Sequence, residues 1–577
     1  MTFNKFEQEC RRILFNYIDE EKIKLEKPKE LADLALPCFL VSKHPNEFAF
    51  QLQEKIEKKL TPKSLILKVK AIGPYLNFYI NYSVFNKIVI KDALDKKYGS
   101  KKSLGKRIVI DYSSPNIAKP MNIGHLRSTI IGQSLYNILS YQGYRCIGDN
   151  HLGDWGTQFG KLICAYKRWG NARDIKAKGI EEMLRLYVKF HEEAEKENSG
   201  IVNTTEQEKT EKISLDDEAR KNVFSLENEA RSWFKKLEDG NKEAKKIWNL
   251  FYKISRNEFS KTYKRLGIKF DYTLGESFYV KETKKLIYEL LSKNIAKKEQ
   301  GAVIIPGFQP PLIIQKSDEA TTYGARELAT IKYRISKFKP EKIIWVTGNE
   351  QRLYFQQVFD ACDKIFQDHP QLIHVDFGLV SLPEGRLSTR EGRVIFLDDV
   401  INQTVDLAKK TIEEKNPTLK NKEKVAEKVA LGAIKYNDLS RDRIKNIAFD
   451  WDEMLRFEGD TGPYLQYTYA RACSITKKSK YSGKTFNANI LNKESETRII
   501  KKLSLFPLAI ENAAINYKPH VVANYLFELA TLFNEFYHSL QVIGSKYEKE
   551  RIALTKAFIN VMKIGLGLLG IEAVEEM

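Results

Sequence analysis

Apolar side chains recur with two different spacings over the first 105 residues. In 6–18 and 48–60 they lie three or four positions apart, which predicts amphipathic helices. Residues 64–72 and 75–82 are short runs rich in β-branched and aromatic side chains, which is typical of strands. We therefore expect an N-terminal α+β domain over residues 1–105, which ends in a charged, glycine-containing linker.

From residue 107 the apolar runs become short and continuous and alternate with helical segments. RIVIDY at 107–112 and RCIGDN at 145–150 flank a helical pattern, and this order is the βαβ unit of a parallel sheet. Later runs of the same kind are 302–306, 311–315, 342–347 and 372–378, with a helix predicted at 353–366. The pattern therefore predicts one parallel sheet built from two separated parts of the chain.

A charged helical insertion, at about 165–300, separates those two parts. Its middle, 190–225, is too polar to bury much surface, so we expect a solvated helix pair or a mobile segment there. From about residue 400 the pattern is almost entirely helical, with predicted helices at 400–415, 423–439, 464–478, 523–540 and 551–569. The fold class expected is a multidomain α/β protein with a helical C-terminal domain.

Composition adds one positive indication. Lys and Arg number 95 and Asp and Glu 75, a formal net charge of +20. Two explanations remain open, a lysine-rich proteome or a polyanionic partner such as a nucleic acid. The six cysteines are scattered without a CxxC pair, which disfavours disulfides and a structural metal and favours a reducing cytoplasm. Neither a signal peptide nor a membrane-spanning segment is expected.

One motif match is misleading. GLGLLG at 565–570 has the spacing of a dinucleotide-binding loop. Only seven residues follow it, so the helix and the acidic residue that the motif requires cannot be present. We interpret it as the end of a helix and its turn.

Candidate chemistry is concentrated after the first predicted strand. Pro115 and Pro120 stiffen a loop, and a helix is expected to begin at about 121–123. Asn122 and His125 are three residues apart and therefore share one face of the first helical turn. The free N–H groups of that turn and the helix dipole attract phosphate. Gly124 leaves room for a base or ribose, and Lys119 supplies a nearby charge. The bland alternative is a loop whose polar residues only cap the helix, with His125 an ordinary surface histidine.

Several longer motifs in sequence order carry a resemblance to a known family. The segments 113–135 and 148–162 closely resemble the bacterial-type arginyl-tRNA synthetases, which are class I aminoacyl-tRNA synthetases. Further similarities to that family, in order, lie at 72–81, 385–400, 461–475 and 566–577. The resemblance implies a tRNA-binding N-terminal domain and a split Rossmann-like catalytic domain at 106–400. A helical connective segment at 401–455 and an anticodon-binding domain at 456–577 are expected to follow.

The resemblance also implies an activity. Members of the family use ATP with Mg²⁺ to form arginyl-adenylate from L-arginine and then pass the arginyl group to tRNA(Arg). No protein-bound structural metal is expected, and the implied protein is a cytoplasmic monomer with no membrane association. The alternative is a catalytically inactive, synthetase-like RNA-binding protein, because two motif positions depart from the family pattern.

Both departures concern the ATP site. By resemblance the site comprises Pro115, Lys119, Asn122, Gly124 and His125 from the first motif and Arg386, Ser388 and Arg390 from the second. Asn122 replaces the first histidine of the usual His-Ile-Gly-His, so it can donate a hydrogen bond but carries no charge. The second motif lacks its second lysine, and Lys119 stands where a lysine is thought to substitute for it in this family. The alternative for Lys119 is a solvated loop lysine, and the second motif, taken in isolation, would be interpreted as an ordinary charged loop.

The remaining candidates would bind the two larger substrates. The resemblance assigns arginine binding to Asp111, Asn116, Tyr323, Glu327 and Gln351, and tRNA binding to Tyr464, Gln466, Tyr467 and Arg471. Carboxylates suit a planar guanidinium because they accept paired hydrogen bonds, and aromatic side chains suit unpaired bases because they stack on them. Two alternatives remain open: an ordinary surface acid at 327 and core tyrosines on the helix at 464–478.

Overall fold

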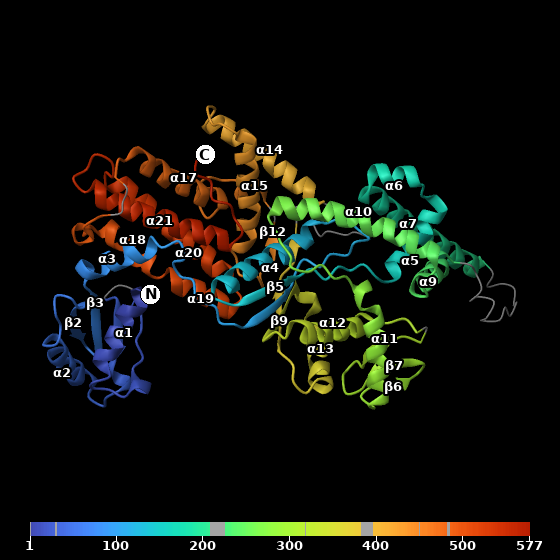
Figure 1. The fold of residues 1–577 in the computed structure, drawn as a ribbon, viewed down its shortest axis with the longest axis horizontal. Coiled ribbons are helices and arrows are strands. Elements are labelled where there is room, and N and C mark those ends of the chain that lie inside the picture. Colours follow the sequence, from blue (N-terminus) through green and yellow to red (C-terminus); the bar gives the residue numbers. More distant parts are fainter. Residues whose placement is uncertain are drawn as a thin grey trace. The chain divides into compact units, whose positions relative to one another are not determined.

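The computed structural model describes residues 2–28, 32–207, 225–317, 319–381, 396–448, 450–481 and 485–577. It contains two compact units. Unit 1 consists of Met1–Lys102, Ala408–Ser440 and Leu455–Met577, and unit 2 of Ser103–Leu407 and Arg441–Met454 (Figure 1). The four domains expected from the sequence, with limits near 105, 400 and 455, stay a prediction.

A four-stranded parallel sheet forms the centre of unit 2. Its order is β10–β9–β4–β5, and the strands are β4 (Arg107–Asp111), β5 (Arg145–Asp149), β9 (Lys342–Gly348) and β10 (Gln371–Phe377). In register, Val109 of β4 pairs with Ile147 of β5 and with Ile343 of β9. The predicted parallel sheet from two separated chain segments is therefore confirmed.

Helix α4 (Ile123–Tyr141) connects β4 to β5. Its predicted apolar stripe is buried, which holds the helix against the sheet, and comprises Ile123, Leu126, Ile130, Leu135, Ile138 and Leu139. Gly143 follows the helix with φ +90°, a conformation that favours glycine. The other sheet helices are α12 (Tyr323–Phe338) and α13 (Arg352–Ile365).

The runs at 302–306 and 311–315 do not join this sheet, contrary to the prediction. They form β7 (Ala302–Ile305) and β8 (Leu312–Gln315), which pair antiparallel and extend to β6 (Lys297–Glu299) in a small separate sheet. Only residues 306–311 connect the two runs. Parallel neighbours need a crossover of a dozen or more residues, so this short connection allows only a hairpin.

The insertion is helical over its described residues, as expected. It comprises α5 (Thr157–Trp169), α6 (Ala172–Lys178), α7 (Ile180–Gln207), α9 (Leu226–Glu238), α10 (Lys242–Leu266) and α11 (Glu276–Ser292). Part of the polar segment at 190–225 continues α7, and 208–224 lie outside the described residues.

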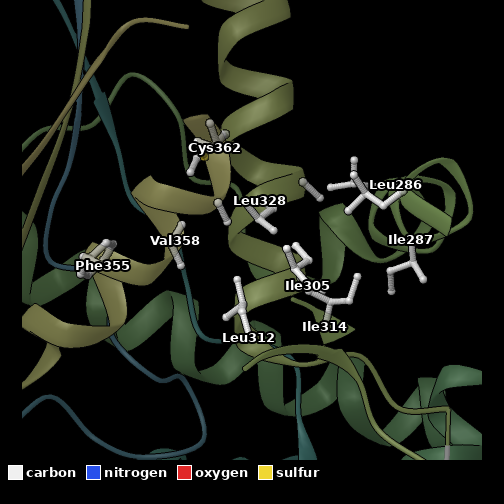
Figure 2. Close-up of a cluster of buried hydrophobic side chains, with 14 of the residues drawn as sticks. Leu286, Ile287, Ile305, Leu312, Ile314, Leu328, Phe355, Val358 and Cys362 are labelled. Atoms are coloured by element: carbon white, nitrogen blue, oxygen red, sulfur yellow. The ribbon is translucent and has the colours of Figure 1, made fainter. Parts of the chain in front are cut away.

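A buried apolar cluster attaches the small sheet to three helices (Figure 2). It combines Leu286 and Ile287 of α11 with Ile305 of β7, Leu312 and Ile314 of β8, Leu328 of α12, and Phe355, Val358 and Cys362 of α13. Trp345 of β9 belongs to the same cluster. Because close-packed side chains resist displacement, the cluster fixes α12 against the parallel sheet.

The last part of unit 2 returns from a distant segment of the chain. Strand β12 (Ile447–Ala448) pairs in parallel with β11 (Val380–Ser381) and is followed by α16 (Trp451–Met454). Helix α14 (Leu397–Lys415) begins in unit 2 and ends in unit 1.

Unit 1 combines the N-terminal residues with the C-terminal helices. The N-terminal part has a three-stranded antiparallel sheet in order β1–β3–β2. Its elements are α1 (Thr2–Leu14), β1 (Leu34–Pro37), α2 (Pro45–Glu57), β2 (Ile66–Ile72), β3 (Tyr75–Ile80) and α3 (Tyr82–Ala93). The α+β prediction is confirmed, although β1 and α3 were not predicted.

The C-terminal part of unit 1 is helical, as predicted, although it includes residues 422–439 of the expected connective segment and two helices within 494–516 that were not predicted. Its helices are α15 (Lys422–Leu439), α17 (Gly462–Lys478), α18 (Glu494–Ser504), α19 (Phe506–Asn516), α20 (His520–Ser539) and α21 (Glu548–Leu568). GLGLLG is the end of α21 and its turn, as interpreted, with Gly570 at φ +70°. All six cysteines are buried and free, and none of the described helices is long and apolar enough to cross a membrane.

Candidate functional site

A cavity of about 890 Å³ lies in unit 2, beyond the carboxyl ends of the parallel strands. Open parallel sheets bind ligands at this edge because successive loops converge there. Eight of the residues predicted from the sequence line the cavity: Asp111, Asn116, Asn122, Gly124, His125, Tyr323, Glu327 and Gln351. The fold therefore gathers candidates for arginine and ATP binding from three separate segments of the chain, 111–125, 323–327 and 351.

The first turn of α4 is closed by a reciprocal cap. The Asn122 side-chain oxygen accepts hydrogen bonds from the backbone N–H groups of Gly124 (3.0 Å) and His125 (3.3 Å). In return the Asn122 backbone N–H donates to His125 Nδ1 at 3.1 Å. Asn122 and His125 therefore cap the helix, as the alternative interpretation stated.

The cap also determines which proton His125 carries. Burial, assisted by the nearby charge of Lys119, lowers the pKa of His125 to about 4, so the ring is neutral at pH 7. Because Nδ1 accepts a hydrogen bond, the proton of the neutral ring resides on Nε2. His125 is thus a hydrogen-bond donor without a charge.

Lys119 and Pro115 do not line the cavity. The ammonium of Lys119 lies over the ring of Tyr187 of α7, 4.6 Å from its centroid. Pro115 contributes its backbone carbonyl, which accepts a hydrogen bond from the N–H of Gly153 at 3.0 Å. The structure therefore differs from the expectation that Lys119 points directly at the phosphate-binding turn.

Arg386, Ser388 and Arg390 of the second motif lie outside the described residues. The chain on both sides of that segment contacts the start of α4. Leu397 N–H donates to the Met121 carbonyl at 3.0 Å, and Phe396 pairs with Asn122 in an antiparallel bridge. On the other side, the buried Arg127 guanidinium donates to the Gly378 carbonyl at 2.6 Å. Two segments more than 250 residues apart are thereby joined at one helix terminus.

One acidic side chain of the cavity is partly neutralised by a buried arginine of the protein itself. The fully buried Arg334 forms ion pairs with Asp111 and Asp149. The other oxygen of Asp111 accepts a hydrogen bond from the Ser114 hydroxyl at 2.6 Å. Asp111 is therefore already paired, and it offers a ligand less charge than its position alone suggests.

Glu327, unlike Asp111, has no ion pair with Arg334 among the contacts described. It is 9% exposed, so the surface-acid alternative is wrong. One of its oxygens accepts a hydrogen bond from Trp345 Nε1 at 2.8 Å. Burial raises the pKa of Glu327 to about 7, Asp111 adds to this, and Arg334 opposes it. A cationic ligand would restore the ionised form.

Among the cavity residues that were not predicted are His151, Glu276 and Arg326. His151 follows β5 by two residues, and Glu276 at the start of α11 forms an ion pair with Arg326 of α12, with 2.8 Å between Oε2 and Nε. The Arg326 guanidinium lies 4.7 Å from the centroid of the Tyr323 ring. Proximity to the end of a parallel strand could have identified His151, whereas no sequence signal singles out Glu276 within a charged insertion.

Comparisons with known proteins decide the family. The description "tRNA synthetases class I (R), catalytic domain" matches residues 87–451, and "Arginyl tRNA synthetase N terminal domain" matches 4–80. "DALR anticodon binding domain" matches 465–577. The chain belongs to the arginyl-tRNA synthetases.

Relatives and solved structures agree with this family. The arginine–tRNA ligase of Clostridium botulinum strain Langeland is 43% identical over 573 residues, 97% of this chain and 96% of the relative. That of Exiguobacterium sibiricum is 39% identical over 588 residues, 99% of each. The Thermus thermophilus arginyl-tRNA synthetase structure has a TM-score of 0.80 at 24% identity over 100% of both chains. The Plasmodium falciparum arginyl-tRNA synthetase has a TM-score of 0.74 at 24% identity, covering 99% and 98%. The two structures show the shared fold.

The second candidate site of this synthetase lies on α17 in unit 1. Tyr464, Tyr467 and Arg471 share one face of the helix, since they are three and seven residues apart. The Arg471 guanidinium lies 4.8 Å from the ring centroid of Tyr467, and its Nη1 donates to the Asn534 side-chain oxygen at 2.7 Å. Asn534 in turn donates to the Tyr464 hydroxyl at 2.9 Å. These contacts hold a cation and two aromatic rings together.

Gln466 does not belong to that face, contrary to the prediction. Its side chain has 0% exposure, and its amide nitrogen donates to the backbone carbonyls of Lys428 and Glu572. It is two residues from Tyr464, so it points about 200° around the helix. A bound RNA cannot contact it without opening the domain.

Proposed function

We propose that this chain ligates L-arginine to tRNA(Arg) through an arginyl-adenylate, using ATP, for protein synthesis. The observation that carries the proposal is the single cavity lined by both the capped turn at Asn122–His125 and the acidic side chain of Glu327. One feature suits a triphosphate and the other a guanidinium, and adenylate formation requires both substrates side by side.

The residues would act mainly by position and charge. The carboxylate of arginine attacks the α-phosphate and pyrophosphate leaves, so no covalent enzyme intermediate is needed. The α4 N-terminus, with its macrodipole and the Nε2–H of His125, would stabilise charge on phosphate oxygens. Lys119, together with Arg386, Ser388 and Arg390, would add further stabilisation. Asn122 would act indirectly, by capping the turn and fixing the tautomer of His125.

Arginine binding would depend most on Glu327. Its pKa is raised by burial and by Asp111, so a guanidinium cation that pairs with it gains a buried, charge-assisted contact. Tyr323, Asn116 and Gln351 would complete the site with polar contacts. Asp111 would have a secondary role, because Arg334 and Ser114 already occupy its oxygens.

Mg²⁺ would accompany the triphosphate. Among the described residues no group of three or more His, Cys, Asp or Glu side chains could hold a metal ion. Mg²⁺ keeps several waters and prefers phosphate oxygens, so the nucleotide itself would provide its ligands.

The protein would act as a monomer in the cytoplasm. The tRNA would contact unit 1. The support on α17 is the group of Tyr464, Tyr467 and Arg471, which offers ring faces and a cation to unpaired bases. The formal charge of +20 would attract the phosphate backbone.

The test is arginine-dependent exchange of pyrophosphate into ATP, measured with and without tRNA, followed by charging with each of the twenty amino acids. The proposal predicts that, of the twenty amino acids, only arginine supports pyrophosphate exchange and is charged onto the tRNA. Complete absence of exchange with tRNA present, in a protein that still binds tRNA, would establish the inactive RNA-binding alternative instead.

A further inference from the structure

The loop that precedes α4 is braced by the helical insertion at three successive points. The Ser113 hydroxyl lies 2.7 Å from the hydroxyl of Tyr263 of α10. The hydroxyl of the fully buried Ser255, also on α10, donates to the Ile117 carbonyl at 2.6 Å. The third contact, Lys119 over Tyr187, comes from α7. All of these residues belong to unit 2.

The third contact differs from the other two because it involves a charged side chain. Lysine is flexible, and an ammonium at the end of a loop samples many positions unless something holds it. Tyr187 is itself fixed, since it is 8% exposed and packs edge to face against His191 with 4.7 Å between ring centroids. The aromatic face therefore offers a rigid place for the ammonium.

The type of side chain that contacts Lys119 determines whether its positive charge is neutralised. A carboxylate in the place of Tyr187 would fix Lys119 but also neutralise it. A ring face attracts the ammonium through its quadrupole and leaves the net charge in place for a phosphate. That charge is felt at the turn, since Lys119 is the second cause, after burial, of the lowered pKa of His125. The arrangement suits a lysine that must be kept charged and near the α4 terminus.

We propose that Tyr187 is a positioning residue, which holds the ammonium of Lys119 against α7, on the loop that leads into α4, so that its charge can stabilise the phosphates during adenylate formation. The insertion helix α7 thereby contributes to the reaction from outside the cavity. The proposal rests on the function proposed above and on the role of Lys119 in it.

The experiment compares single variants of the full chain in arginine- and tRNA-supplemented pyrophosphate exchange. Tyr187→Phe keeps the ring and is expected to retain kcat within about twofold. Tyr187→Leu keeps an apolar side chain without a ring, and we expect kcat to fall about tenfold with an unchanged KM for arginine. Phe190→Leu is the matched control, because Phe190 is a fully buried aromatic residue of the same helix that faces Lys161 and not Lys119.

A second series keeps the proposal testable if Tyr187→Leu does not fold. Phenylalanine at 187 is replaced by analogues with one, two and three ring fluorines, which weaken the ring quadrupole and barely alter shape. We expect kcat to fall stepwise with fluorination, and the steps to vanish in a Lys119→Met background. A merely structural ring would give no such series.

The outcomes separate the two proposals. If Lys119→Met leaves kcat unchanged, the assigned role of Lys119 fails, and this inference fails with it. If Lys119→Met lowers kcat but the fluorinated series is flat and Tyr187→Leu matches Phe190→Leu, only the positioning role of Tyr187 is overturned.

Discussion

The cavity region of unit 2 and the α17 face of unit 1 each contain an arginine side chain next to groups that could bind a substrate. The two regions differ in how deeply these side chains are buried. Behind the cavity lining, Arg334 is fully buried between two carboxylates, and Glu327 of the lining is 9% exposed. On α17, Arg471 is half-buried beside Tyr467, which is 39% exposed. The first region consists of charges that depend on one another, and the second of side chains that water can still reach.

The difference predicts how each region responds to change. Removing one member of a buried charge group leaves its partners unpaired in a low dielectric, so the cost falls on folding as well as on function. Removing a partly exposed side chain costs little stability, because water replaces the lost contacts. Binding effects should therefore be separable from stability on α17 but not around Arg334.

The largest expected effect is on stability. Arg334→Met leaves Asp111 and Asp149 buried without their cation, and we expect unit 2 to lose about 3–5 kcal/mol of unfolding free energy. Urea denaturation followed by far-ultraviolet circular dichroism measures it, because both units contain helices, whereas all six tryptophans of the chain lie in unit 2. Arg471→Met is the control and should change stability by less than about 1 kcal/mol. Equal losses in the two variants would remove the distinction between the regions.

The next effect is on chemistry. His125→Ala removes a preorganised donor of the phosphate-binding turn, and Lys119→Ala removes the charge held against Tyr187 outside the cavity. Each should slow adenylate formation by about 10²-fold or more. Pyrophosphate exchange measures this rate, and the affinity for tRNA should stay unchanged. Turnover close to that of the unmodified protein in both variants would show that these residues do not serve the reaction.

A smaller effect is the pH dependence of arginine binding. The pKa of Glu327 is raised to about 7, so the carboxyl is mostly protonated at pH 6 and mostly ionised at pH 8. Because the guanidinium pairs with the ionised form, affinity should rise about tenfold from pH 6 to pH 8. Calorimetric titration with arginine measures it. In Glu327→Gln the binding should be weaker and the rise absent; an unchanged rise would assign the titration to another group, such as Glu276.

An effect of the same size is expected on tRNA recognition. Arg471→Ala should raise the KM for tRNA about tenfold, through loss of one cation at a stacking surface, and leave the KM for arginine unchanged. Lys477→Ala, on a different face of α17, should change the KM for tRNA by less than about twofold. A selective loss of arginine affinity in Arg471→Ala would contradict the placement of tRNA on this face.

The sequence predicted this molecule best where the local pattern and the tertiary structure agree. The strand at 107–112, the buried stripe of α4 and the turn at Gly143 all follow from residue types and spacing. Because parallel strands bring their carboxyl ends together, the position of the cavity follows from the same pattern. The placement of Asp111 and Asn122 at one edge was therefore predictable.

Other features depended on contacts that one sequence does not reveal. An exception is the hairpin of 302–306 with 311–315, because the short connection that favours it is visible in the sequence. Gln466 lies between Leu465 and Tyr467, and its place in the domain interior depends on hydrogen bonds to the backbone carbonyls of Lys428 and Glu572. The position of Lys119 depends on Tyr187, 68 residues away in an insertion without a motif.

The central claim is that the first turn of α4 holds the triphosphate of ATP in the cavity that also binds arginine. A crystal structure of the protein with arginine and a non-hydrolysable ATP analogue tests it most directly. We predict phosphate oxygens within hydrogen-bond distance of His125 Nε2, and the guanidinium of arginine paired with Glu327. A nucleotide bound outside this cavity, or arginine bound away from Glu327, would contradict the account.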